Sequence, residues 1–337
     1  MISFVSKKNN PFLDDLALLE NNCEILEYDR YKFIPKWLKL FLSQKELCLS
    51  KDYISNNQTM LKTYFSFEPL ECADSYYIDS IFYNKEFGAF DFYQKIRQKS
   101  IIKNLQSSKL YASSNSLKNH IINEFKSDIP TLNIEVQYPS IYQLKTDYKK
   151  IKTRFCDRYE IKYDDKILLF KGDDFINDGG KEFINIYDEL VQTSNTKVVS
   201  VFIASKSQIE GFRFMARKLK SYENIIFCDI DDLEFSIEEI MTISDIYLHP
   251  TYRKKFNRDT IKAMYYKNAV FISHQNFASE LVDTFSLIEN PNDTTSFGIV
   301  HKIEALLNDE ESLKTIQEEN KDKVKHLNIE NLNISTF

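Results

Sequence analysis

The sequence has few glycines and cysteines, no excess of positive charge and no long apolar run. The five cysteines form no CxxC pair and no cluster with histidine, which argues against a structural zinc site or a disulfide framework. A net charge of −6 argues against a general nucleic-acid-binding protein. No apolar run approaches the roughly 18 residues that cross a bilayer, and MISFVSKKNN is too polar for a signal peptide. We therefore expect a cytosolic protein in a reducing compartment.

One segment would suit a peripheral contact with the inner face of the membrane. Pro35–Leu42 (PKWLKLFL) places Trp37 and other large apolar residues beside two lysines, as interfacial helices do. A partly buried helix of the first domain explains the same segment, and this is the interpretation we favour.

From about residue 159 onward, short apolar runs alternate with stretches of helical length. This alternation is typical of βαβ units around a parallel sheet, whose strands are buried on both faces and rich in Val, Ile or Phe. The predicted strands are Lys166–Phe170, Val198–Ile203, Asn224–Phe227, Asp245–His249 and Ala269–Ile272. The predicted helices are Lys181–Val191, Ser207–Leu219, Ser236–Ile243, Arg258–Tyr266 and a C-terminal helix near Glu311–Lys325. Such a series predicts a doubly wound domain.

The first half of the chain shows a weaker version of the same pattern. The predicted elements are strands Ile2–Val5 and Glu24–Tyr28 around a helix near Leu13–Leu19, then a strand from Lys109, helix Ser116–Phe125 and strand Asn133–Gln137. A chain of 337 residues suits two domains of about 150 residues. We expect an α/β fold of two Rossmann-like domains, residues 1–150 and 159–325, with parallel sheets, helices on both faces and a cleft between the domains.

Three of the six glycines fall within nine residues after the strand Lys166–Phe170. Gly172, Gly179 and Gly180 belong to the segment FKGDDFINDGGK, residues 170–181, which we call block one. Glycine lets the backbone turn tightly and approach a ligand, and the free N–H groups of a helix start favour an anion such as a diphosphate. Neither the dinucleotide fingerprint GxGxxG nor the P-loop motif is present.

A second segment, LHPTYRKKFNRDTIKAM, residues 248–264, is block two. A strand is predicted to end at His249, and the loop that follows holds Arg253 and two lysines. Asn257 is the predicted N-cap of the next helix. Positive charge therefore follows a strand end, where open α/β sheets bind ligands.

Two other patterns are weaker. The sequence CDIDD, residues 228–232, contains a DxD motif of the kind that can hold a metal ion, but such motifs arise by chance in an acidic chain. His249 and His274 end predicted strands, and we interpret each as a satisfied strand-end histidine rather than a ligand. We expect no metal and no cofactor.

Together the two blocks resemble the C-terminal domain of GT-B glycosyltransferases of the retaining class called glycosyl transferases group 1, or family 4. Block one of that class follows a strand and reads G-R-D-F-x-x-K-G-G, and block two reads P-[ST], then E-x-F-G-x-x-x-x-E-A-M-A-x-G-x-P-V-I. The matching residues are Gly172, Asp174, Phe175, Gly179, Gly180, Pro250, Thr251, Phe256, Ala263, Met264, Val270 and Ile272. Glu280 fits a further glutamate of the class, and residues 113–140 look like the end of its acceptor domain.

Four charges are inverted relative to that class. The arginine and lysine that hold the donor diphosphate fall at Asp173 and Asp178, and the two glutamates of block two fall at Lys254 and Lys262. In one arrangement the charges have exchanged sides of the site, so that the lysines of block two bind the diphosphate. In the other, the aspartates pair with the lysines and neutralise the site.

The resemblance implies a retaining, metal-independent transfer of a sugar from a nucleotide-sugar to a glycan, lipid-linked or protein acceptor, with the acceptor on the first domain. The implied donor and phosphate site consists of Gly172, Asp173, Asp178, Gly179, Gly180, Lys181, Thr251, Arg253, Lys254, Phe256, Asn257, Arg258 and Lys262. The inverted charges favour an alternative, an inactive binding module or partner of an active transferase. A third possibility is another enzyme of this fold, such as an epimerase. No residue stands out as catalytic, and the sequence does not indicate an oligomeric state.

Overall fold

A computed structural model of the protein describes residues 2–6, 23–27, 63–66, 74–79, 105–106, 108–172, 174–289 and 297–328. The chain divides into two compact units, Met1–Tyr142 with Leu327–Phe337, and Gln143–His326. The predicted helices near Leu13–Leu19 and Pro35–Leu42 lie outside the described residues, as does Asp173.

The described strands of the N-terminal unit form one parallel sheet in the order β2-β1-β3-β4-β5-β6. They are β1 Ile2–Ser6, β2 Cys23–Glu27, β3 Thr63–Ser66, β4 Ser75–Ile78, β5 Lys109–Ala112 and β6 Ile134–Val136, and α4 spans Asn115–Phe125. The strands and the helix predicted in the described residues are thus confirmed, whereas β3 and β4 were not predicted. Helix α4 begins where expected because the Ser114 hydroxyl accepts a hydrogen bond from the Leu117 N–H.

The C-terminal unit, Gln143–His326, has a second parallel sheet in the order β12-β11-β10-β7-β8-β9. Its strands are β7 Lys166–Lys171, β8 Val198–Ala204, β9 Ile225–Asp229, β10 Ile246–His249, β11 Ala269–Ser273 and β12 Leu287–Ile288. Its helices are α5 Tyr148–Tyr159, α6 Gly180–Thr193, α7 Lys206–Ala216, α8 Ile237–Ile243, α9 Arg258–Tyr265, α10 Phe297–Asn308 and α11 Glu310–Val324, with short 3₁₀ turns η1 Tyr222–Asn224, η2 Phe277–Leu281 and η3 Thr284–Ser286. All five strands and five helices predicted for this half are confirmed.

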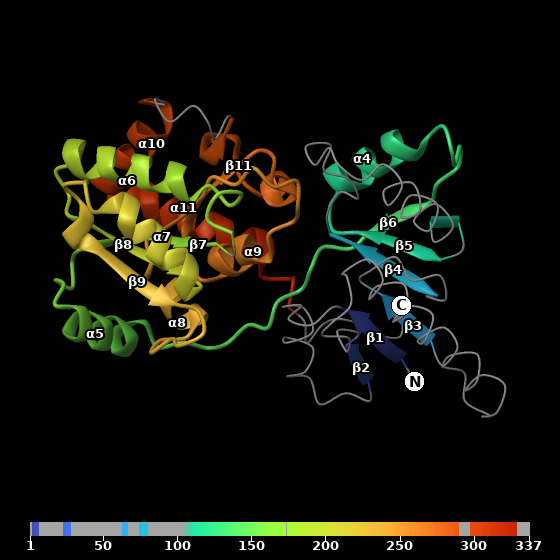
Figure 1. The fold of residues 1–337 in the computed structure, drawn as a ribbon, viewed down its shortest axis with the longest axis horizontal. Helices are drawn as coiled ribbons and strands as arrows, with labels where there is room; N and C mark the ends of the chain where they lie inside the picture. The colour runs from blue at the N-terminus through green and yellow to red at the C-terminus, as the bar shows by residue number, and fades with distance from the viewer. Residues whose placement is uncertain are drawn as a thin grey trace. The chain divides into compact units, whose positions relative to one another are not determined.

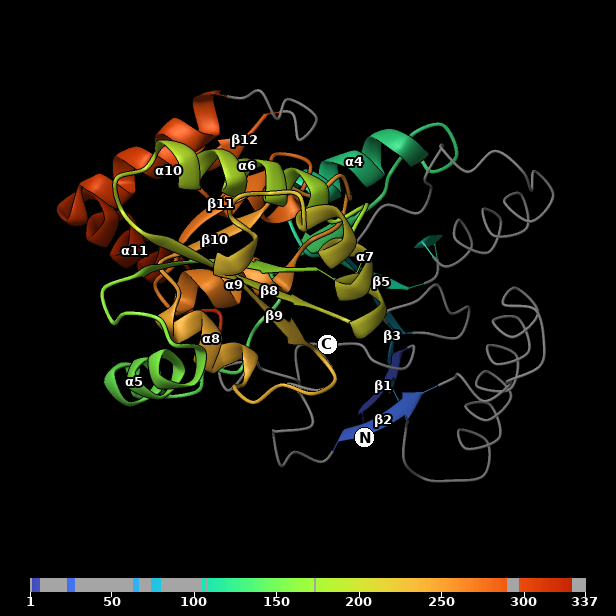
Figure 2. The ribbon, with the colours of Figure 1, turned by 60° about the vertical axis from the view of Figure 1, so that its left-hand side comes forward.

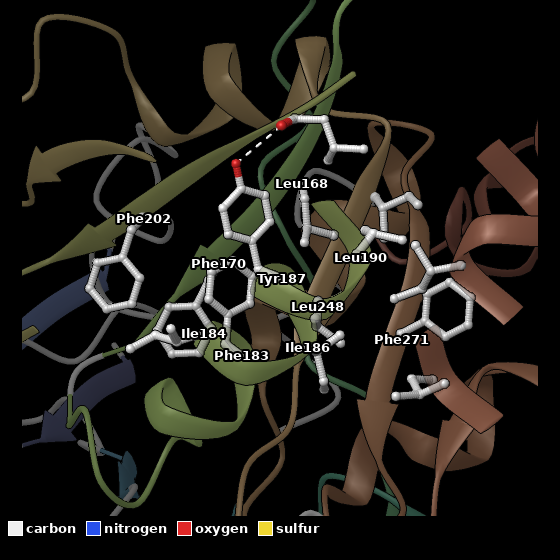
Figure 3. Close-up of a cluster of buried hydrophobic side chains, with 14 of the residues drawn as sticks. Leu168, Phe170, Phe183, Ile184, Ile186, Tyr187, Leu190, Phe202, Leu248 and Phe271 are labelled. Carbon is white, nitrogen blue, oxygen red and sulfur yellow. Dashed lines mark hydrogen bonds between the residues drawn. The ribbon is translucent and has the colours of Figure 1, made fainter. Parts of the chain in front are cut away.

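Helices cover both faces of the C-terminal sheet, as an all-parallel sheet requires. In Figures 1 and 2, α6 and α10 lie on one side of the sheet and α5 and α8 on the other. The sheet face toward α6, α7 and α10 carries Leu168 and Phe170 of β7 with Phe202 of β8, all buried in one hydrophobic cluster (Figure 3). The Phe170 and Phe202 rings are stacked with centroids 4.8 Å apart.

Strand order in this sheet follows the Rossmann pattern. Numbered from β7 onward in chain order, the strands read 3-2-1-4-5-6 from the β9 edge. The order reverses between β7 and β10, which pair directly through Ile246 with Leu168 and Tyr247 with Leu169. Both strands are parallel, so the loops that follow them leave from the same carboxyl edge of the sheet.

Within the described residues, no helix combines the length and apolar character that crossing a bilayer requires.

Candidate functional site

The loops after β7 and β10 meet at the point where the strand order reverses. These loops are block one and block two, about 80 residues apart in the sequence but adjacent in the sheet. Open α/β sheets bind ligands in the crevice outside the carboxyl ends of the strands at such a switch point. The topology therefore brings together the two segments that the sequence singled out.

Two glycines allow block one to lie directly against block two. Gly179 has φ +80°, in the left-handed region, and a Cβ there would overlap the carbonyl group of Pro250. A Cβ at Gly180 would overlap the ring of Phe175. Helix α6 starts at Gly180, and its N-cap Gly179 offers no side chain to its first N–H groups. The backbone N–H groups at the start of α6, which is the positive end of the helix dipole, therefore lie beside Pro250.

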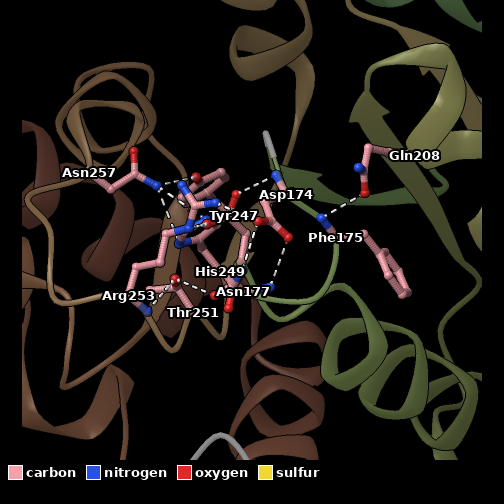
Figure 4. Close-up of polar contacts among 10 residues, drawn as sticks. Asp174, Phe175, Asn177, Gln208, Tyr247, His249, Thr251, Arg253 and Asn257 are labelled. Atoms are coloured by element: carbon pink, nitrogen blue, oxygen red, sulfur yellow. Dashed lines mark hydrogen bonds and ion pairs between the residues drawn. The ribbon is translucent and has the colours of Figure 1, made fainter. Parts of the chain in front are cut away.

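Hydrogen bonds join the two loops through the backbone carbonyl of Asn177. The Thr251 hydroxyl donates to this carbonyl at 3.0 Å (Figure 4). The Tyr252 N–H donates to the same carbonyl at 2.9 Å. The Thr251 oxygen in turn accepts from the Arg253 N–H at 3.1 Å. Thr251 is buried, so this junction fixes the backbone from which the Arg253 side chain departs.

Arg253 of block two is held by two carboxylates of block one. Its Nη2 lies 2.9 Å from Asp174 Oδ2, and its Nε lies 3.1 Å from Asp178 Oδ1. Asp178 is buried and also accepts from the Asp174 N–H at 2.9 Å. Partial burial acts to raise the pKa of Asp174, but hydrogen bonds from Asn177 and the Arg253 charge outweigh it and hold that pKa below its usual range. Asp174 is therefore a carboxylate at neutral pH.

A second ion pair lies behind this junction, between β7 and α9. Lys171 Nζ lies 2.6 Å from Asp259 Oδ2, and Asp259 is in the first turn of α9. Asn257 caps that helix by accepting from the Asp259 N–H at 2.8 Å, which confirms the predicted N-cap. The Asn257 amide also contacts the buried ring of His249, which stacks on Phe170 and Tyr247. His249 is thus a satisfied strand-end histidine, as predicted.

Comparison with known proteins assigns the chain to a family. The model of the family described as glycosyl transferases group 1 matches residues 152–323, just over half of the chain. The protein belongs to this family. Its family supports glycosyl transfer as its activity, in agreement with the resemblance found in the sequence. No sequence among the curated proteins matches the chain.

Solved structures of low sequence identity share the whole fold. WaaG, a glycosyltransferase of lipopolysaccharide biosynthesis, is 13% identical with a TM-score of 0.75, over 96% of this chain and 95% of WaaG. HepE of Anabaena, solved with UDP and glucose, is 13% identical with a TM-score of 0.75, over 99% of this chain and 97% of HepE. A glycosyltransferase of Rickettsia africae is 14% identical with a TM-score of 0.69, over 96% and 93% of the two chains. The fold is therefore GT-B, with two Rossmann-like domains.

The group 1 motif positions can now be placed in this member of the family. Asp178, at the position of the family's lysine, forms its ion pair with Arg253, which the sequence had not matched to a motif position. Lys262, at the position of a glutamate, lies on α9 with its ammonium 2.8 Å from Glu238 of α8. Lys254 and Lys181 have exposed side chains. The sequence suggested either that the lysines bind the diphosphate or that they pair with the aspartates. Neither arrangement included Arg253 as the partner of Asp178.

The remaining predicted residues divide between the interior and the surface of this glycosyltransferase domain. Phe256 is buried, Arg258 is the first residue of α9, and Gly172 follows the end of β7. His274 and Glu280 are exposed. In the CDIDD segment, the Asp231 N–H donates to Asp229 Oδ1, which is a local turn. Across the described residues, no group of three or more His, Cys, Asp or Glu side chains is arranged to hold a metal ion.

Sequence reasoning missed Asp174 and Asp259 as charged members of the site. Asp174 was matched only as the aspartate of the family motif. Its ion pair with Arg253 depends on a contact between residues 79 positions apart. Asp259 pairs with Lys171 across 88 residues. The sequence did offer a signal for the Lys171–Asp259 pair. Lys171 lies at the carboxyl end of a predicted strand, and Asp259 lies at the start of the helix that follows another one.

A cavity of about 780 Å³ lies at the opposite, amino edge of the C-terminal sheet, where it is lined by Lys166, Asp245 and residues of α9 and α11. Several of its lysines are already in ion pairs: Lys166 with Asp245, Lys267 with Glu318 and Lys314 with Glu310. Ligands of parallel α/β sheets bind at the carboxyl edge. We therefore place the candidate site at blocks one and two and not at this cavity.

Proposed function

We propose that the protein transfers a sugar from a nucleoside-diphosphate sugar to a hydroxyl group of a glycan, lipid-linked or protein acceptor. The donor diphosphate lies between the Gly172–Lys181 loop and the Arg253–Lys262 segment, against the start of α6. In the reaction the bond from the sugar C1 to the β-phosphate oxygen breaks, a bond from C1 to the acceptor oxygen forms, and the acceptor hydroxyl loses its proton. Negative charge develops on the departing nucleoside diphosphate.

The observation that supports this proposal most strongly is the position of Arg253. A guanidinium has five N–H donors, and the contacts to Asp174 and Asp178 engage its Nη2 and Nε. The remaining donors leave capacity for phosphate oxygens. The Gly180 N–H donates to the Phe175 carbonyl, and the N–H groups that follow it in the first turn of α6 supply further donors. Donors aimed at the developing charge of a leaving group lower the barrier to its departure.

The neighbouring structures support a uridine nucleotide as the first donor to test. HepE of Anabaena was solved with UDP and glucose, and a trehalose-6-phosphate protein of E. coli with UDP-2-fluoro glucose. The trehalose protein is 11% identical with a TM-score of 0.65. A retaining and metal-independent reaction, with the acceptor on the N-terminal domain, is part of this proposal, and family membership supports it.

A thermal-shift screen with UDP, GDP, ADP, CDP and UDP-glucose, run beside an assay of nucleotide release, tests the proposal. A nucleotide at 100 times its Kd stabilises the protein by about 2.7 kcal/mol. We expect Arg253→Gln to abolish most of that stabilisation, whereas Lys267→Gln, in an exposed pair at the amino edge, leaves it unchanged. Equal stabilisation of wild type and Arg253→Gln would show that the diphosphate binds elsewhere.

The clamped arginine also favours a second candidate, an inactive module that binds a nucleotide or glycan or partners an active transferase. Asp174 and Asp178 together more than neutralise Arg253, and one of them stands where the family has a lysine. This candidate predicts nucleotide binding, or none, without sugar release. Measurable release of nucleotide from a nucleotide-sugar by the wild type, lost in Arg253→Gln, would exclude it.

A further inference from the structure

Helix α7, on the outside of the C-terminal unit, exposes large apolar side chains. Ile209, Phe212 and Ala216 form its buried stripe against the sheet. Phe214 is nevertheless 76% exposed, and the adjacent Met215 is 41% exposed. Scattered apolar residues on a surface need no explanation. The charged residues around Phe214 and Met215 distinguish this pair from such scattered residues.

Cations surround the pair. The exposed residues from 206 to 220 include Lys206, Arg213, Arg217, Lys218 and Lys220, with Glu210 as the one acid of that stretch. This is a local excess of positive charge in a chain whose net charge is −6. We call Phe214, Met215 and these five cations the α7 surface.

Most cations of the α7 surface form no ion pair with a described residue. Arg213 lies over the Phe227 ring at 4.9 Å from its centroid, which keeps it beside the core. For Lys206, Arg217, Lys218 and Lys220, the structure shows no ion pair with any described residue. Long, unpaired cations on either side of an exposed phenylalanine suit a partner whose negative charge is diffuse and whose interior is apolar.

An anionic bilayer offers both properties at once. We propose that the α7 surface binds an anionic lipid membrane peripherally, with Phe214 and Met215 entering the headgroup boundary and the flanking lysines and arginines above them. Each cation near an anionic membrane surface strengthens binding by about fivefold. An acidic protein surface would satisfy the charges, but its carboxylates are fixed in place and it would have to supply an apolar pocket for Phe214.

The start of α7 is connected to the candidate site. Gln208, in its first turn, accepts a hydrogen bond from the Phe175 N–H of block one at 2.9 Å, and the Phe175 ring packs edge-on against Phe212. A helix of 11 residues is about 16 Å long, so a membrane-bound α7 keeps block one near the bilayer. Resting on the proposed function, this favours a lipid-linked acceptor among the three classes.

Sedimentation of the full-length protein with vesicles tests the membrane contact without any assay of transfer. We expect binding to phosphatidylcholine vesicles with one quarter phosphatidylglycerol, little binding to pure phosphatidylcholine, and loss of binding at high salt. The variant Phe214→Ser with Met215→Ser should bind roughly tenfold more weakly. Replacing Arg217, Lys218 and Lys220 by Gln should weaken binding by about a hundredfold.

The matched control carries Tyr163→Ser and Lys314→Gln, an exposed aromatic residue and an exposed cation elsewhere in the same unit. It should bind vesicles as the wild type does. As a gain of signal, Phe214→Trp should show a blue-shifted emission on adding anionic vesicles. Wild type that stays in solution with anionic vesicles, or a Phe214→Ser, Met215→Ser variant that binds like wild type, overturns the proposal. Capture by polyglutamate but not by vesicles would indicate an acidic protein partner instead.

Discussion

Gly179 and Gly211 are glycines of the C-terminal unit in opposite situations. Gly179 needs a positive φ and lies against the Pro250 carbonyl, whereas Gly211 is an exposed residue inside α7 with open space around it. Gly179→Ala should destabilise the protein by about 2 kcal/mol or more, because it adds both backbone strain and an overlap. Gly211→Ala should stabilise it by about 0.5–1 kcal/mol, because alanine favours a helix.

Urea unfolding of the two alanine variants beside wild type measures this difference. The same chemical change is made in both, so opposite signs identify the local geometry as the cause. A small or favourable effect of Gly179→Ala would mean that blocks one and two are not in contact.

Lys254 and Lys262 should respond differently to substitution by alanine. Lys262 has a side chain that is 13% exposed and pairs with Glu238, so its removal leaves a largely buried carboxylate unpaired. We expect Lys262→Ala to lower the free energy of unfolding by about 2 kcal/mol. Lys254 is exposed, so Lys254→Ala should leave stability within about 0.5 kcal/mol of wild type and act, if at all, on nucleotide affinity.

Denaturant unfolding and nucleotide titration of each single variant separate the two roles. If Lys262→Ala unfolds like wild type but binds nucleotide more weakly, Lys262 belongs to the phosphate site after all, as the sequence suggested.

At the scale of the elements, the Lys171–Asp259 pair joins β7 to the start of α9. Burial acts to raise the pKa of Asp259, but the charge and hydrogen bond of Lys171 outweigh it, so its folded pKa lies below the usual value. A depressed carboxyl pKa contributes stability above the unfolded pKa of about 3.9 and loses it as pH falls through the folded pKa. The contribution should therefore be constant at neutral pH and fade below about pH 4.

Asp259→Asn tests this contribution because it keeps the side-chain shape and removes the charge. We expect it to cost about 2–3 kcal/mol at pH 7, less than for a fully buried pair because Asp259 retains some solvent contact. The difference from wild type should shrink as unfolding is measured at progressively lower pH. A difference that stays the same down to pH 3 would show that the ion pair contributes nothing.

At the scale of the whole molecule, a bound nucleotide should protect only part of the chain from hydrogen exchange. The chain divides into two compact units, and the proposed diphosphate site belongs to the C-terminal one. On adding UDP or UDP-glucose, we expect slower exchange in residues 174–183 and 250–258 first. The amino-edge segments 144–148 and 310–321 serve as an internal control and should exchange as before.

Exchange measured by mass spectrometry on the full-length protein resolves these segments. Protection centred on the amino-edge cavity would move the nucleotide site to the other end of the sheet.

The sequence alone determined the local structure of the C-terminal unit. Its strands are continuous Val-, Ile- and Phe-rich runs, because both faces of a parallel sheet are buried, and its helices repeat every 3.6 residues. Asn257 was recognisable as a cap because capping depends on neighbours within three residues. The sequence did not predict β3, β4 and β12. Strand β12 has only two residues, too few to show a period.

Only the tertiary structure decided which charges meet. Both blocks were recognisable from their residues, but the partner of Asp178 lies 75 positions further along the chain, and Arg253 reaches it because β7 and β10 are neighbours in the sheet. Likewise, Lys262 faces Glu238 because α9 lies beside α8. Helix and strand periods are properties of a few consecutive residues, whereas strand order arises from burying the whole sheet between two layers of helices. The sequence therefore indicated the family and the two segments of the candidate site, and the fold determined that Arg253 of one segment contacts Asp174 and Asp178 of the other.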